Sequence, residues 1–140
     1  MTGPSPHLSW AKLACKDGTP YPQTFIDDGR CAILADLFEE IRELVHAPLV
    51  ILSAYRTPAH NRAIGGAPNS QHVQGRALDL RPPAGVTPAD FYAAILAARL
   101  PTLGGIGVYR TFVHVDVRAI PVSGRIARWN GGAQVKDDRG

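Results

Sequence analysis

The chain has 140 residues, of which 45% are hydrophobic and 19% are charged, and its formal charge is +3. This length and composition fit one soluble globular domain that buries its own core. The slight positive charge suits an anionic polymer such as a cell wall or a nucleic acid and does not choose between them. Because the chain has no run of five like charges, we do not expect a nucleic-acid partner.

The two cysteines and the first residues limit the class of protein further. Cys15 and Cys31 belong to no CxxC pair, so a cysteine zinc site is not expected. Two buried free thiols are the simpler interpretation, and one disulfide is the alternative. Residues 1–10 lack the basic head and apolar core of a signal peptide. No apolar run approaches the roughly 18 residues of a membrane span. We therefore expect a protein that is cytoplasmic as synthesised, not inserted in a membrane, and monomeric.

The N-terminal part of the chain is expected to be irregular. Residues 1–6 predict a flexible end, and residues 8–15 predict a short edge strand followed by a helical turn. Trp10 and Leu13 of that segment are expected to pack on the core. Residues 16–28 are rich in Gly, Pro and Asp and predict a loop.

The clearest helix is predicted to begin at Asp28 or Gly29 and to end near His46. Its apolar residues recur at helical spacing and form one stripe, which contains Ile33, Leu34, Leu37, Phe38, Ile41, Leu44 and Val45. Pro48 ends this helix, since a residue before proline avoids the helical conformation. Residues 49–53 then predict a short apolar strand in the centre of a sheet.

Two further helices have recognisable first turns. Thr57 as the cap and Pro58 in the first turn predict a short helix that ends near residue 64. Thr87 and Asp90 form a capping box, which predicts a helix that continues to about Arg99.

Three later segments predict strands. They are residues 77–80, residues 104–109, whose glycines allow close backbone approach, and residues 112–117. In the last of these His114 and Asp116 share one face, because side chains two apart on a strand point the same way.

The predicted fold class is therefore α+β, with a small, mainly antiparallel sheet packed by two or three helices. We expect one domain over residues 1–140, with flexible ends at residues 1–6 and from about residue 132 onward.

A candidate metal site lies in the second half of the chain. His72 and Asp79 are seven residues apart with Gly75 between them, and His114 follows in a later strand. Three protein ligands with a fourth position left for water are usual in catalytic zinc sites. Asp116 is a candidate proton carrier. Arg56, at the end of a buried strand, is a candidate for holding a carbonyl oxygen or a carboxylate.

Each of these residues also has a simpler structural explanation. His72 and His114 could be hydrogen-bonded core residues. Asp79, in an apolar strand, needs a cation or donors, and Arg76 or Arg81 could supply them. Asp116 could pair with Arg118 in the same way. Spacing alone leaves these alternatives open, and the zinc motif HExxH is absent.

The chain resembles the zinc D-Ala-D-Ala carboxypeptidases and the related phage endolysins, in their compact single-domain form. The resemblance extends over most of the sequence. It is strongest in the pattern S-x-H-x-x-G-x-A-x-D, which runs from Ser70 to Asp79. The other matching segments are residues 13–16, 53–61, 65–72, 105–109, 112–118 and 124–129.

This resemblance implies a fold, a cofactor and a substrate. The fold would be the small α+β domain shared with hedgehog-type signalling domains. One zinc ion per chain would be held by His72, Asp79 and His114. The substrate would be the stem or cross-link peptide of bacterial peptidoglycan, cut by a D,D-carboxypeptidase or an endopeptidase with zinc-bound water as nucleophile. Candidate substrate-binding residues are Arg56, Ser70 and Tyr55.

One position departs from the pattern of several branches of this family. They carry Glu or Asp as general base three residues before the last histidine ligand, where this chain has Thr111. Asp116 is the nearest acidic substitute, and its alternative role is to orient His114. The alternative function is a non-catalytic, zinc-stabilised wall-binding or phage structural module. Without a signal peptide, an enzyme that reaches the wall after holin-type release is the expected setting.

Overall fold

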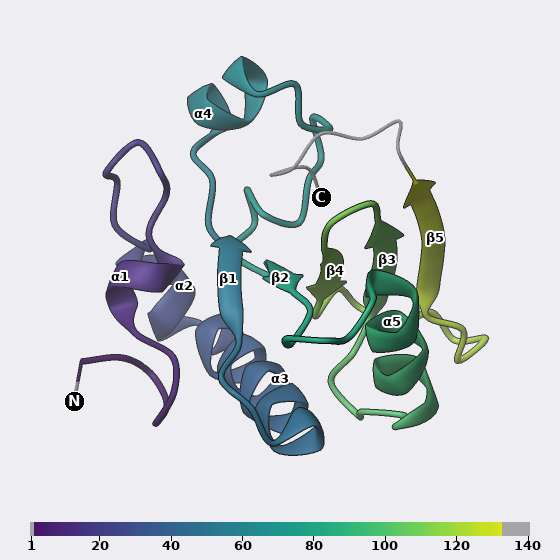
Figure 1. Cartoon of the computed structure of the whole chain (residues 1–140). Helices are drawn as coiled ribbons and strands as arrows, with labels where there is room; N and C mark the ends of the chain where they lie inside the picture. The colour runs from purple at the N-terminus through teal and green to yellow at the C-terminus, as the bar shows by residue number, and fades with distance from the viewer. Residues whose placement is uncertain (1, 133–140) are drawn as a thin grey trace.

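The computed structural model describes residues 2–132, and the fold is α+β, as predicted (Figure 1). The helices are α1 (Trp10–Leu13), α2 (Gln23–Asp27), α3 (Arg30–Val45), α4 (Pro58–Ala63) and α5 (Pro88–Ala97). The strands are β1 (Val50–Ser53), β2 (Ala77–Arg81), β3 (Gly105–Tyr109), β4 (Val113–Asp116) and β5 (Ala127–Gly132). The flexible end expected from about residue 132 falls almost wholly outside the described residues.

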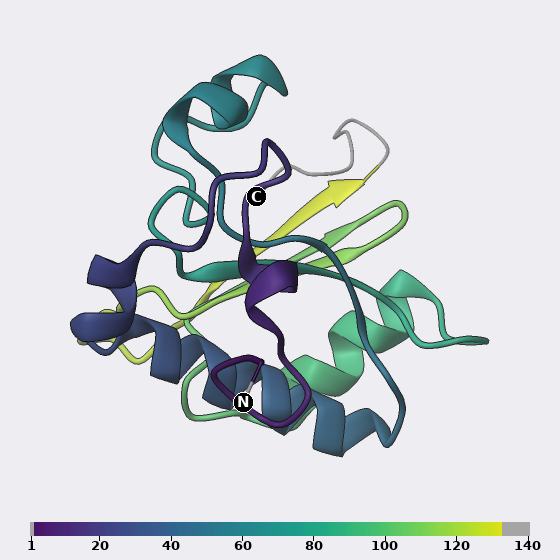
Figure 2. The ribbon, with the colours of Figure 1, turned by 90° about the vertical axis from the view of Figure 1, so that its left-hand side faces the viewer.

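The five strands form one sheet in the order β1-β2-β4-β3-β5. All neighbouring pairs are antiparallel except β3 and β5, which are parallel. Helices α3 and α5 lie along one face of this sheet, and α4 and the loop that follows it lie on the other side (Figure 2). The sheet therefore has one face for the core and a second face available for polar residues.

The core lies between this sheet and the two longer helices. Leu34, Phe38 and Ile41 of α3 and Phe91 and Ile95 of α5 are buried there. The observed first and last residues of α3 and α5 lie within about two residues of the predicted ones. Thr87 caps α5 as expected, since its hydroxyl accepts a hydrogen bond of 3.1 Å from the Asp90 amide.

Two predictions about the α3–β1 region are wrong. The first concerns two members of the apolar stripe of α3: Leu34, Leu37, Phe38 and Ile41 are buried as predicted, but Ile33 and Leu44 are exposed by 46% and 37%. Cys31 and Ala35 are buried on that side instead. The second is the central position of β1, which is an edge strand with Val50 exposed. Of its apolar residues, Ile51 packs against the core while Val50 faces solvent.

The loop predicted for residues 16–28 contains the short helix α2, and the prediction missed it. The last strand, β5, was also not predicted. Cys15 and Cys31 are both buried and free, so the simpler interpretation of the two thiols is confirmed. In the described part of the chain, no helix is both long and apolar enough to cross a membrane.

Candidate metal centre

The three predicted ligands meet on the face of the sheet away from α3 and α5. Asp79 of β2 and His114 of β4 are register partners across neighbouring strands. Leu78 and Leu80 point into the core, so Asp79 between them points to the opposite face. His72 comes from the turns that precede β2. All three predicted ligand side chains are fully buried.

The ligand atoms lie close to one another. The Oδ1 atom of Asp79 is 3.1 Å from Nε2 of His72 and 3.0 Å from Nδ1 of His114. One ligand atom from each residue lies within 4.8 Å of the other two. Tetrahedral zinc ligands at about 2.0–2.2 Å from the metal are about 3.3–3.6 Å apart. The donor set and its spacing therefore fit a zinc ion after small adjustments.

The outer ring nitrogens of both histidines are held by other groups. Nδ1 of His72 lies 2.6 Å from the carbonyl oxygen of Ala54, and Nε2 of His114 lies 2.7 Å from Oδ2 of Asp116. These bonds fix the ring orientation and leave Nε2 of His72 and Nδ1 of His114 directed at Asp79. Such outer partners are the usual means by which proteins orient metal-binding histidines.

The second carboxylate oxygen of Asp79 pairs with Arg56. Nη2 of Arg56 is 3.3 Å from Oδ2 of Asp79, while its Nε donates to Ser53 and its Nη1 to Asn61. The side chain of Arg56 is only 1% exposed. The cation beside Asp79 is therefore Arg56.

Burial and neighbouring charges set the protonation of the cluster. Burial opposes ionisation of Asp79, but the charges and hydrogen bonds of His72 and His114 outweigh it and lower the pKa to about 2. For His72 burial dominates and lowers its pKa, whereas the hydrogen bonds to Asp116 and Asp79 raise the pKa of His114 despite its burial. An ionised Asp79 and a neutral His72 are the forms that bind a metal.

Asp116 is shared between His114 and Arg118. Its Oδ1 accepts a bond of 2.9 Å from Nε of Arg118, and its Oδ2 accepts one of 2.7 Å from Nη2. Burial would raise the pKa of Asp116, but the hydrogen bonds from His114 and Arg118 hold it well below the usual range. Gly105 leaves room for this pair, because a Cβ there would lie 2.5 Å from an Asp116 oxygen.

Trp129 of β5 forms a wall beside His114, and sequence reasoning did not assign it a role in the site. Its ring centroid is 5.1 Å from that of His114, and its Nε1 donates a bond of 2.6 Å to the hydroxyl of Tyr109. The indole lies over Gly107, where any Cβ would collide with Nε1. The predicted role of the β3 glycines, close approach of backbone to a neighbour, is confirmed. The signal for Trp129 was its aromatic character in an otherwise polar segment.

Three other residues named in the sequence analysis, Ser70, Tyr55 and Thr111, are not among the predicted ligands. The Ser70 hydroxyl is buried and accepts a bond of 3.1 Å from the amide of His72, so it supports the ligand loop. Tyr55 packs edge-to-face on Tyr21 and Phe25, with centroids 6.1 and 6.0 Å away. Thr111 is exposed in the turn before β4.

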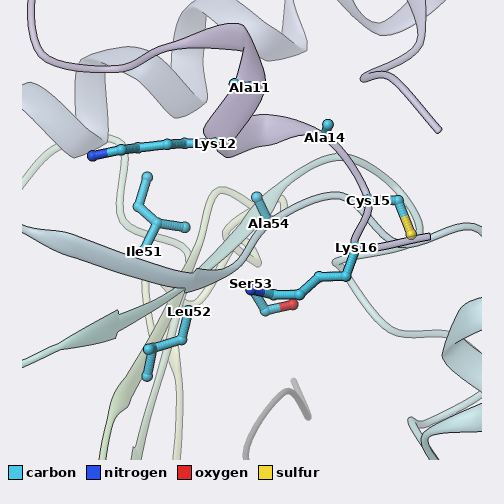
Figure 3. Close-up of a pocket in the computed structure, with 9 residues that line it drawn as sticks. All are labelled: Ala11, Lys12, Ala14, Cys15, Lys16, Ile51, Leu52, Ser53 and Ala54. Carbon is cyan, nitrogen blue, oxygen red and sulfur yellow. The ribbon is translucent and has the colours of Figure 1, made fainter. Parts of the chain in front are cut away.

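Two pockets adjoin the site from different sides. The pocket in Figure 3 has a volume of about 320 Å³, and Lys16 extends back along it toward Ser53. Ala54 in its wall bonds the outer nitrogen of His72, so this pocket lies behind the ring. The other, which we call the front pocket, has a volume of about 330 Å³ and is lined by Ala67, Asn69, Ser70, Gln71, Tyr109, Arg118 and Trp129.

Comparison with known protein families agrees with this arrangement. The model of the peptidase M15 family matches residues 6–116, which include all three predicted ligands. The chain belongs to the peptidase M15 family. No curated protein and no solved structure matches the chain. M15 peptidases are zinc-dependent in general, and the buried His72, Asp79 and His114 could bind a metal in this member.

Proposed function

We propose that this M15 peptidase is a zinc enzyme that hydrolyses peptide bonds of bacterial peptidoglycan. The observation that carries the proposal is the convergence of His72, Asp79 and His114 on one buried point, with both histidine rings fixed from behind. These three residues would hold the ion and leave a further coordination position. A bound zinc ion would acidify a water molecule and polarise the scissile carbonyl group.

Within this proposal Arg56 positions Asp79. Its side chain is 1% exposed, and its guanidinium contacts Asp79, Ser53 and Asn61. It therefore holds the ligand carboxylate in place and neutralises its charge. The substrate-holding role expected from the sequence would require the guanidinium to leave these contacts.

In the same way, Asp116 would position the ring of His114. Its carboxylate bonds the ring nitrogen that points away from the ligand cluster. A proton carrier works best with a pKa near the working pH, whereas the pKa of Asp116 is held well below its usual range. These facts support the orienting role over the general base that was expected. In that role Asp116 would leave proton transfer to another group.

The test is digestion of purified peptidoglycan with and without a chelator, followed by mass analysis of the released products. We expect chelator-sensitive release that disappears in the His72→Ala variant. Free D-alanine would identify a carboxypeptidase, and larger peptides would identify an endopeptidase. Release that persists unchanged with the chelator and in His72→Ala would refute the zinc mechanism.

The second candidate is a non-catalytic module that binds the cell wall and keeps zinc for stability. Thr111 favours this alternative, because several branches of the family have a carboxylate at that position. The absence of any release from several wall types, with one zinc ion measured per chain, would select this alternative. Retention of the protein on insoluble peptidoglycan would then be the function to measure.

A further inference from the structure

We propose that Arg118 recognises the free α-carboxylate of a substrate whose last residue is released by the cut, with the front pocket holding that residue. This inference rests on the proposed peptidase function and specifies its substrate class. The substrate would be a peptide that ends one residue beyond the scissile bond. The enzyme would then act as a carboxypeptidase.

The carboxylate of Asp116 connects Arg118 to His114, a predicted zinc ligand. Its Nη2 and the Nε2 of His114 are both 2.7 Å from the same oxygen, Oδ2 of Asp116. The Cζ atom of Arg118 also lies 5.1 Å from the ring centroid of Trp129, which itself packs beside His114. The guanidinium is thus held in a fixed orientation next to the ligand cluster.

Arg118 keeps hydrogen-bonding capacity toward the front pocket. A guanidinium has five N–H donors, and the bonds to Asp116 occupy two of its nitrogens, Nε and Nη2. Among residues 2–132, its Nη1 donates no hydrogen bond. The side chain is 32% exposed and lines the front pocket. Planar guanidinium groups recognise carboxylates through paired hydrogen bonds.

The charges around the pocket favour an anionic ligand. Each carboxylate of the cluster already has its own arginine, Arg56 for Asp79 and Arg118 for Asp116. Among the described residues that line the front pocket, none is Asp or Glu. A divalent ion in the site would therefore add positive charge that these side chains leave uncompensated, and a substrate carboxylate would balance part of it.

The size of the pocket agrees with one terminal residue. Its volume of about 330 Å³ is near the lower end of the range of about 300–1,000 Å³ for small-ligand sites. One residue extends a peptide by at most about 3.8 Å, so only a carboxylate close to the cut bond reaches Arg118. In an interior residue the α-carboxyl group forms an amide and carries no charge.

The experiment uses a matched pair of peptides, diacetyl-L-lysyl-D-alanyl-D-alanine as the free acid and as the C-terminal amide. For the zinc-loaded parent we expect kcat/KM to be at least about 10-fold higher for the acid, since a hydrogen bond to a charged group contributes about 1.5–3 kcal/mol. In Arg118→Gln this ratio should fall to about 1, mainly through KM for the acid. Arg118→Lys should retain an intermediate ratio.

Two controls separate recognition from positioning. Arg125→Gln removes an exposed arginine outside the front pocket and should leave the ratio unchanged. Zinc content is measured for each variant, because Arg118 also contacts Asp116. If Arg118→Gln slows the acid and the amide equally, Arg118 acts only through Asp116 and the inference is wrong. Equal cleavage of the two peptides by the parent protein also overturns it.

A binding measurement keeps this inference separate from the proposed function. Calorimetry compares D-alanyl-D-alanine with its amide on the zinc-loaded parent and on Arg118→Gln. A preference for the acid that Arg118→Gln removes would support carboxylate recognition even if neither test peptide is cut. Loss of cleavage on all walls and peptides would count against the peptidase, whereas equal binding of acid and amide would count against Arg118.

Discussion

At the scale of single residues, hydrogen bonds behind the two histidines decide which ring nitrogen faces the cluster. His72 is held by a neutral backbone carbonyl and His114 by the carboxylate of Asp116. A carboxylate partner makes an imidazole more basic than a carbonyl does. Burial lowers the pKa of both rings, but the hydrogen bonds and charges of Asp116 and Asp79 raise that of His114 overall. His114 should therefore be the histidine ligand that depends more on its support.

The first prediction concerns Asp116→Asn, which removes the charge but keeps the shape of the side chain. We expect zinc affinity to fall about 10- to 100-fold, the usual effect of losing a partner behind a metal ligand. Competition with a chromophoric chelator measures it. Asp90→Asn, on the exposed side of α5, is the matched control and should keep the parent affinity. Unchanged affinity with lost turnover would restore Asp116 as the proton carrier.

The second prediction concerns Gly107→Ala, whose Cβ would collide with the indole of Trp129. We expect a loss of about 1–3 kcal/mol in the free energy of unfolding, as for other overpacked positions. Denaturant unfolding measures it, and tryptophan fluorescence reports displacement of the indole. In a Trp129→Ala background the same substitution should cost much less, because the collision partner is gone. Equal costs in both backgrounds would show that the indole does not require Gly107.

The residues of the cluster could be predicted from the sequence better than the contacts that hold them in place. The spacing of His114 and Asp116 places them on one face, and the structure confirms that arrangement. The contact between Arg56 and Asp79 was not predictable, because spacing favours nearby arginines such as Arg76. It depends on how β1 and β2 pair, which is a tertiary property.

At the scale of elements, Glu39 of α3 attaches the N-terminal segment to the core. Glu39 accepts hydrogen bonds from the Ser5 hydroxyl at 2.7 Å and from the His7 amide at 2.8 Å, and it lies 2.6 Å from the His7 ring. Burial alone would raise the pKa of Glu39, but these bonds together lower it. The contact therefore stabilises the segment only while Glu39 is ionised.

The third prediction follows from the sign of that shift. A carboxyl group with a lowered pKa in the folded state contributes stability above its ordinary value of 4.5, and the contribution is lost as the pH falls through the folded value. Acidification below pH 4.5 should release residues 5–8 before the rest of the fold. Hydrogen exchange of their amides against pH measures this. Glu39→Gln should show the release already at neutral pH, while Glu43→Gln, on an exposed position of α3, should not.

The predicted elements were most accurate where local signals are strong. The boundaries of α3, α4 and α5 follow from apolar periodicity, capping threonines and prolines. The failures have a different origin. An apolar strand such as β1 can lie at an edge when a short helix covers it, and β5 depends on parallel pairing with β3 about twenty residues earlier. Neither feature is encoded in the segment itself.

At the scale of the whole molecule, the candidate metal site joins parts of the chain that are distant in sequence. The carbonyl of Ala54 follows β1, His72 lies in a loop, Asp79 is on β2 and His114 is on β4. A bound ion would therefore connect the central antiparallel pair to the β1 edge and to the loop that carries the ligand motif. Metal binding in such a site contributes directly to folding stability.

The last prediction is that zinc raises the stability of the whole domain. At a free zinc concentration 100 times Kd, the free energy of unfolding should rise by about 2.7 kcal/mol relative to the chelated protein. Thermal unfolding in zinc and in chelator measures the difference as a shift in Tm. His72→Ala should remove most of the shift, whereas His46→Ala, at the exposed end of α3, should retain it. A shift of the same size in His72→Ala would place the bound zinc outside this cluster and would count against the proposed metal centre.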